Sequence, residues 1–239
     1  MFVDVASKTR YCSTVEILLN VVGVDMPMQC RQCAVNAFCR VSHIAARHPA
    51  SLVVAERSLP SGASLLSGEA DRGKLFAIKV GGVVLRHGLG QRPANHKPVA
   101  VLGRKHILGM MAMLSPGTCL EAETYMPSRV CELDASMLRS MIEHDSEAAR
   151  AMALAVSSAA TEVLNWSLIP RLPDARARLL ATLQQLSASQ EAQVIHLPDR
   201  PTLAALCGCA EETVSRVMTA LVRQGAISRL GRQCIALPV

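Results

Sequence analysis

The amino-acid sequence predicts an α+β fold: an N-terminal β-roll, one long helix and a C-terminal winged helix-turn-helix. Three observations point to it. Short β-rich runs alternate with turn residues across residues 56–133, and residues 135–164 contain neither Gly nor Pro. Residues 199–221 have the apolar spacing of two short helices joined at a glycine. We therefore divide the chain into an N-terminal segment (1–55), the β-roll (56–133), the long helix (134–168) and the winged helix-turn-helix (169–239).

The composition predicts a cytoplasmic protein whose core is built from aliphatic side chains. The 239 residues suffice for two modest domains, and half of them are hydrophobic although only 3% are aromatic. No charge-free apolar run reaches the length of about eighteen residues that a membrane span requires. The start, Met1 to Asp4, has an acid where a signal peptide has basic residues. The net charge of +6 fits a polyanionic partner.

The β-roll is predicted from four strand-like runs. Residues 74–80 and 83–86 are joined by Gly81-Gly82, which is the signature of a β-hairpin. Residues 98–103 and 129–133 continue the pattern of short apolar strands. Short strands at this spacing are typical of a jelly roll or a similar barrel.

The long helix is predicted to begin after Asp134, which is a good N-cap residue. Its apolar positions recur at alternating spacings of three and four, which favours pairing with a second copy of the helix. The alternative is a helix packed on the core of its own domain. The residues of this expected seam are Met141, Ala148, Met152, Ala155 or Val156, Ala159 and Val163.

The helix-turn-helix is predicted from its caps and its turn. Asp199 is a plausible N-cap, Pro201 is tolerated in the first helical turn, and Gly208 supplies the left-handed residue of a tight turn. The apolar spacing then assigns the buried side of the two helices to Leu203, Leu206, Val214, Val217 and Leu221.

The exposed face of the second helix is predicted to carry Glu212, Ser215 and Arg216. Arg can donate two bonds to a guanine edge, Glu can accept one from cytosine, and Ser can do either. The alternative is an ordinary amphipathic helix pair with solvated charges. The segment that follows is predicted to form a β-hairpin wing, in which Arg229 and Arg232 would contact phosphates.

Three cysteines near the N-terminus are spaced C-x2-C-x5-C: Cys30, Cys33 and Cys39. The chain has nine cysteines, an odd number, and a disulfide framework is not expected in a reducing compartment. Thiolates so spaced suit zinc or an iron–sulfur cluster, and both usually take four protein ligands. A fourth ligand must therefore come from elsewhere in the chain.

The order of cysteine cluster, β-roll, long helix and winged helix-turn-helix resembles the CRP/FNR superfamily of bacterial transcription regulators. The cysteine spacing and the Glu212-x-x-Ser215-Arg216 pattern resemble its fumarate and nitrate reduction regulator type, which senses oxygen with a [4Fe-4S] cluster. The resemblance covers nearly the whole chain from Cys30 onward. It implies a cyclic-nucleotide-binding-like jelly roll, a homodimer, double-stranded DNA with TTGAT-like half-sites, and RNA polymerase as a partner.

The resemblance also favours one fourth ligand. In that type the ligand lies in the last strand of the β-roll within a Val-Cys-Glu sequence, and Val130-Cys131-Glu132 matches it. Cys119 follows Ser115-Pro116-Gly117-Thr118, which reads as a loop and lacks the motif. The expected cluster ligands are therefore Cys30, Cys33, Cys39 and Cys131.

The chain departs from the cyclic-nucleotide-binding branch of the superfamily. In that branch a Gly-Glu pair holds the ribose and an Arg-Ser pair holds the cyclic phosphate. Here Gly109 is followed by Met110-Met111-Ala112, and no Arg-Ser dipeptide follows it within the predicted β-roll. A buried phosphate without an opposing cation is costly, so we expect no cyclic nucleotide.

Two other functions remain open on the sequence alone. The same cysteines would serve a zinc site or a thiol redox switch in a regulator of this kind. An enzyme or electron carrier is disfavoured, because no second catalytic constellation accompanies the cysteines.

Overall fold

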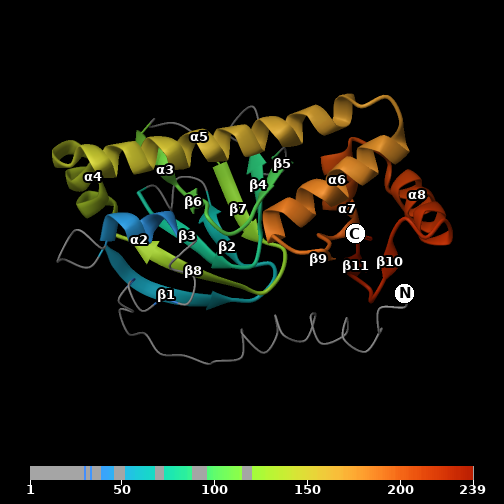
Figure 1. The fold of residues 1–239 in the computed structure, drawn as a ribbon, viewed down its shortest axis with the longest axis horizontal. Coiled ribbons are helices and arrows are strands. Elements are labelled where there is room, and N and C mark those ends of the chain that lie inside the picture. The colour runs from blue at the N-terminus through green and yellow to red at the C-terminus, as the bar shows by residue number, and fades with distance from the viewer. Residues whose placement is uncertain are drawn as a thin grey trace.

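The computed structural model describes residues 30, 33, 39–45, 52–67, 73–87, 96–114 and 120–238. The predicted α+β architecture is confirmed: a β-roll, a long helix and a helix-turn-helix with a small sheet follow one another along the chain. In Figure 1, α5 runs along one side of the molecule from the β-roll to the C-terminal helices. The first twenty-nine residues and Cys119 lie outside the described residues.

The described elements are short in the β-roll and longer in the C-terminal half. In chain order they are α2 (Arg40–Ala45), β1 (Val53–Leu59), β2 (Ser64–Ser67), β3 (Leu75–Val80), β4 (Val83–His87), β5 (Lys97–Leu102), β6 (Ile107–Leu108), α3 (Met110–Leu114), β7 (Leu120–Thr124), β8 (Ser128–Leu133), α4 (Ala135–His144), α5 (Ser146–Leu168), a 3-10 helix (Ile169–Arg171), α6 (Ala175–Gln190), β9 (Val194–His196), α7 (Arg200–Cys207), α8 (Glu211–Arg223), β10 (Ser228–Arg229) and β11 (Cys234–Ala236).

The β-roll consists of two antiparallel sheets, ordered β1-β8-β3-β6 and β2-β7-β4-β5 among the described strands. The predicted β3–β4 hairpin is wrong, because β3 and β4 lie in different sheets and do not pair. A side chain at Gly81 would overlap Ser128, and one at Gly82 would overlap Tyr125. These glycines therefore allow the chain to pass closely between the sheets instead of forming a hairpin turn.

The β1-β8-β3-β6 sheet is apolar on both faces. Phe76, Ile78 and Val130 belong to the core shared with the second sheet, whereas Leu75 and Ala77 belong to a separate cluster with helices α2, α4 and α5. This alternation follows from the two-residue period of a strand. The sheet thus needs cover on its outer face, and the helices supply it (Figure 1).

The predicted long helix is interrupted at one residue. Asp134 is its N-cap as expected and accepts a hydrogen bond from the backbone N–H of Met137. Asp145 then adopts an extended conformation and caps a second helix by accepting from Glu147 and Ala148. The absence of Gly and Pro did not prevent the break, because an Asp side chain can satisfy the N–H groups that a new helix leaves free.

The expected pairing seam is wrong for its first half. Met141, Ala148, Met152 and Ala155 are buried within their own chain, in the cluster that covers the outer face of the sheet. The alternative, a stripe packed on the core of its own domain, is correct for these four residues. The same spacing serves either purpose, so the spacing alone did not separate them.

A different stripe of α5 is exposed. Leu154, Leu164 and Leu168 are 49%, 63% and 56% exposed, and Ser157 and Thr161 between them are exposed as well. Successive members of this stripe are three or four residues apart, as in a helix-pairing seam. We call these five residues the α5 outer stripe.

By length and mean hydropathy alone, Ser146–Arg171 is long and apolar enough to cross a membrane. One such helix is weak evidence, because helices that cover a protein core pass the same test. Here Trp166 and Ile169 are buried, and the indole N–H of Trp166 donates to the carbonyl of Val101 at 3.1 Å. The end of the helix is therefore fixed to strand β5.

The helix-turn-helix forms as the sequence predicts. Asp174 caps α6 and Asp199 caps α7, and Gly208 ends α7 with a φ of 62° in the left-handed region. The expected β-hairpin wing is also present: β10 and β11 pair with each other, and β9 completes a three-stranded sheet. The predicted inward side chains Leu203, Leu206, Val214 and Leu221 are buried, and Val217 packs against them.

The C-terminal part packs directly on the β-roll. The Gln190 amide donates to the Tyr125 hydroxyl at 2.8 Å, and Arg86 donates to the Thr202 hydroxyl at 3.2 Å. Gly103, at the end of β5, is so close to α6 that a Cβ there would overlap the carbonyl oxygen of Ser189. The two parts therefore share one buried core.

This contact gives a test by substitution of glycine. Gly103→Ala should lower the free energy of unfolding by about 1–3 kcal/mol, because the backbone of α6 must move to admit the methyl group. Gly231→Ala is the matched control, since a Cβ there would lie 3.7 Å from Cys234, an ordinary contact. Chemical unfolding of both variants measures the difference, and equal stability would contradict the close packing described.

Candidate functional site

The site is built on strand β8. Cys131 pairs with Glu56 on β1 and with Ala77 on β3. Cys131 packs against the cluster on the outer face of the sheet, the face that α2 covers. Cys39 immediately precedes α2 and packs against the same cluster.

The four predicted ligands meet at a single cavity. Cys30, Cys33 and Cys39 line it from the N-terminal segment, and Cys131 lines it from the sheet, 92 residues beyond Cys39. The backbone N–H of Cys33 donates to the carbonyl of Cys30 at 3.3 Å, a turn that brings their side chains to one place. The other lining residues are Val41, Ser42, Val53, Glu56, Ala77, Ile78 and Lys79.

Burial disfavours ionisation of the Cys30, Cys39 and Cys131 thiols. It raises the pKa of Cys131 to about 12, and the Glu56 carboxylate adds to the rise. Burial also raises the pKa of Cys30 and Cys39, and at Cys30 the neighbouring thiolates contribute. These pKa shifts favour the protonated form of Cys30, Cys39 and Cys131, and a soft metal would have to displace those protons.

The cavity also holds buried charges that the sequence did not reveal. Lys79 and Glu56 are 6% and 8% exposed, and their ammonium and carboxylate are 2.8 Å apart. Arg129 forms a second ion pair with Glu56. Lys79 opposes the rise in thiol pKa at Cys30, Cys39 and Cys131. The only sequence signal was a lysine within an otherwise apolar strand.

The cysteines do not form a compact site for a single ion. Within the described ranges, no three Cys, His, Asp or Glu side chains are placed to hold one metal ion. Sulfur atoms that share one zinc lie about 3.8 Å apart, because Zn–S bonds are about 2.3 Å long. The four cysteines instead line the walls of one cavity.

Other described cysteines lie away from the cavity. Cys207 is fully buried near the helix-turn-helix glycine, 3.2 Å from the Thr182 hydroxyl, and burial raises its pKa to about 11. Cys209 and Cys234 are also free thiols in the C-terminal part. These three are packing residues, as expected of small apolar side chains. Cys12 and Cys119 fall outside the described residues.

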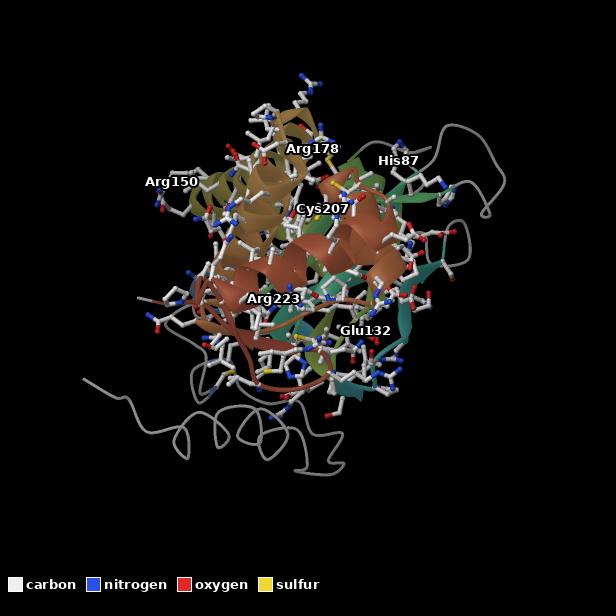
Figure 2. All side chains as sticks on the ribbon, turned by 90° about the vertical axis from the view of Figure 1, so that its right-hand side faces the viewer. His87, Glu132, Arg150, Arg178, Cys207 and Arg223 are labelled. Atoms are coloured by element: carbon white, nitrogen blue, oxygen red, sulfur yellow. The ribbon has the colours of Figure 1, made fainter. Side chains whose placement is uncertain are left out.

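The second candidate site is the exposed face of α8. Glu212 and Arg216 are exposed, one helical turn apart, on the side of α8 opposite the buried Val214 and Leu221. Ser215, next to Arg216, is half-buried. Figure 2 looks onto this end of the molecule, where Arg178 lies beside Cys207. The guanidinium of Arg178 donates to the carbonyl of Gly208 at 3.0 Å and so steadies the turn before α8.

The wing adds positive charge near this helix. Arg229 and Arg232 are exposed on the β10–β11 hairpin, and Arg223 is exposed at the end of α8. A helix carrying a donor–acceptor set beside exposed arginines has the properties needed to read base edges and bind phosphates. Of the three residues predicted on the exposed face, Glu212 and Arg216 are exposed and Ser215 is half-buried, and their contact with DNA stays a prediction.

Comparison with known proteins identifies the C-terminal part. Residues 177–238 match the family model described as a Crp-like helix-turn-helix domain. No curated protein matches the chain at a significant level.

Solved structures share the fold over most of the chain. FixK2 from Bradyrhizobium japonicum has a TM-score of 0.65 and 20% identity, covering 77% of this chain and 92% of its own. A CRP-family transcriptional regulator from Thermus thermophilus has a TM-score of 0.61 and 18% identity, covering 76% and 91%. A CRP/FNR-family regulator from the same organism has a TM-score of 0.58 and 21% identity, covering 77% and 93%.

The chain therefore carries a Crp-like helix-turn-helix domain on the fold of CRP/FNR-family transcription regulators. The two Thermus thermophilus proteins are named as transcriptional regulators.

Proposed function

We propose that this protein is a homodimeric DNA-binding transcription regulator that senses oxygen through a [4Fe-4S] cluster. The cluster would be held by Cys30, Cys33, Cys39 and Cys131. One observation carries the proposal: cysteines from two distant parts of the chain line one cavity, in a chain that ends in a Crp-like helix-turn-helix domain.

The donor set fits an iron–sulfur cluster. Four cysteines line one cavity, and each thiolate of a multi-iron core binds a different iron. Zinc takes thiolate ligands as well, and metal analysis separates the two. When bound, the cluster would supply sensitivity to oxidation, and the surrounding residues would supply its anchoring and its charge balance.

The cavity connects physically to helix α5. Cys39 leads directly into α2, whose Val41 and Ile44 are buried in one cluster with Ala148 and Met152 of α5. Cys131 lies three residues before Asp134, which caps α4. A cluster would thus pin the N-terminal segment against the start of the helices, and its loss would release both.

The α5 outer stripe supports the homodimer. Its three leucines are exposed in one chain, and their spacing of three and four residues fits pairing with a second α5. The buried stripe packs on the sheet, so release of α2 would disturb the helix that carries the dimer contact. We therefore assign dimerisation to the face opposite the one that the sequence indicated.

The proposed DNA target is a palindrome with TTGAT-like half-sites. Arg216 would contact guanine, Glu212 would accept from cytosine, and Ser215 would serve either. A dimer with a two-fold axis places two such helices about one helical turn of DNA apart. As a regulator of this type the protein would act in the cytoplasm and contact RNA polymerase.

We propose no cyclic nucleotide as the ligand. Met110 and Met113 follow Gly109 and are buried, and the helix that holds them, α3, has no acidic residue in its first turn. Among the described residues, the side chains of Met110 and Met113 offer no partner for ribose hydroxyls or a cyclic phosphate.

The direct test is metal content. Protein purified without oxygen should contain iron and sulfide in equal amounts, near four of each per chain. Cys131→Ser should lose most of both, together with specific DNA binding, because one thiolate ligand is absent. Cys209→Ser is the matched control, and Cys119→Ser should also retain the cluster.

The outcomes separate the alternatives. A Cys131→Ser protein that still held a full cluster would move the fourth ligand to another cysteine, with Cys119 first. Zinc in place of iron would favour the zinc site that the sequence left open.

The recognition helix gives a second prediction. Arg216→Ala should cost about 1–3 kcal/mol of discrimination, concentrated at one G·C pair in each half-site. Arg232→Ala, as a loss of a phosphate contact, should weaken all sequences equally. Binding titrations with single-base variants of the site measure this, and uniform weakening by Arg216→Ala would show that Arg216 does not read a base.

The dimer gives a third prediction. Leu164→Glu places like charges in the paired stripe and should raise the dimer dissociation constant about tenfold or more. Gln184→Glu, on the exposed side of α6, is the control for added charge. Sedimentation of the cluster-loaded protein reports the result. A dimer unchanged by Leu164→Glu would place the interface elsewhere.

A further inference from the structure

A buried ammonium group lies in the wall of the cysteine cavity. Lys79 is on strand β3, at the register shift between Ile78 and Val80, and it lines the cavity together with Ala77 and Cys131. Only 6% of its side chain is exposed. A lysine is rarely buried without a charged partner, and Lys79 has one in Glu56.

The Lys79–Glu56 pair belongs to a larger group of charges. Glu56 also pairs with Arg129, so one carboxylate is shared between two cations. The neighbouring pair of Arg57 with Glu132 is neutral by itself. Lys79, Glu56 and Arg129 thus place two cations and one carboxylate beside the thiols.

Four thiolates bound to a [4Fe-4S] core would be stabilised by a nearby positive charge. Their combined negative charge exceeds the positive charge of the core, and burial makes the excess costly. A nearby cation stabilises the site, and the net charge around a cluster also sets its reduction potential. A carboxylate in the same wall destabilises the negatively charged site and lowers its reduction potential.

We propose that Lys79 is a positioning residue that balances the charge of the cysteine site, and that Glu56 limits this effect by sharing the ammonium. This inference rests on the proposed iron–sulfur site and adds to it a control on how readily the site is oxidised. Lys79 makes the loaded site harder to oxidise, and Glu56 makes it easier. Arg129 holds Glu56 in place from the other side.

Two neighbouring substitutions test the proposal because their effects have opposite signs. Lys79→Met removes the cation, so the midpoint potential should fall and the half-time of the cluster in air should shorten about threefold or more. Glu56→Gln removes the carboxylate, so the potential should rise and the half-time should lengthen. Lys79→Arg keeps the charge and should stay near the wild type. Lys97→Met, exposed on the other sheet, is the control for loss of a lysine.

The measurements are redox titration of the visible spectrum and loss of absorbance in air, with thermal unfolding of each variant recorded alongside. A purely structural role would destabilise the site in both variants and shorten both half-times, which would overturn the proposal. If the wild type held a cluster and Lys79→Met left the midpoint potential and the half-time in air unchanged, this inference would be overturned and the proposed function would stand. A wild-type protein that held no cluster would overturn the proposed function and this inference with it.

Discussion

The packing of α5 on the outer face of the β1-β8-β3-β6 sheet is the contact on which the other features depend. Ala148, Met152 and Ala155 cover an apolar face that the strand period makes unavoidable. The same face carries Cys131, and α2 shares the cover through Val41 and Ile44. Because α2 lies between the cysteines and α5 in this cluster, a change at the cysteines would reach α5 through α2.

In the proposed mechanism the two faces of α5 would separate sensing from assembly. The inner face belongs to the hydrophobic cluster beside the cysteine cavity, and the α5 outer stripe would pair with a second chain. The end of the helix is fixed by the bond from Trp166 to Val101, where the helix-turn-helix part also packs. A shift of α5 would therefore change both the proposed dimer contact and the packing of the helix-turn-helix part. Coupling between two distant sites requires such an element in contact with both.

The parts of the fold that were predictable are those set by local chemistry. Asp134, Asp199 and Gly208 act as expected, because a cap or a left-handed turn depends on a few adjacent backbone groups. Gly81-Gly82 was misread, because a glycine needed for close approach looks like a hairpin glycine until its neighbours in space are known. The buried ion pair of Lys79 could not be predicted either, because its partner Glu56 lies 23 residues away on another strand.

The central claim is that the metal state of the cysteine cavity controls the pairing of α5. The most direct test is a stepwise oxygen titration of anaerobic protein, with cluster absorbance and sedimentation recorded on the same samples. We expect the dimer fraction to fall in proportion to the cluster lost, because release of α2 disturbs the inner face of α5. A dimer fraction that stayed constant while the cluster disappeared would contradict the account.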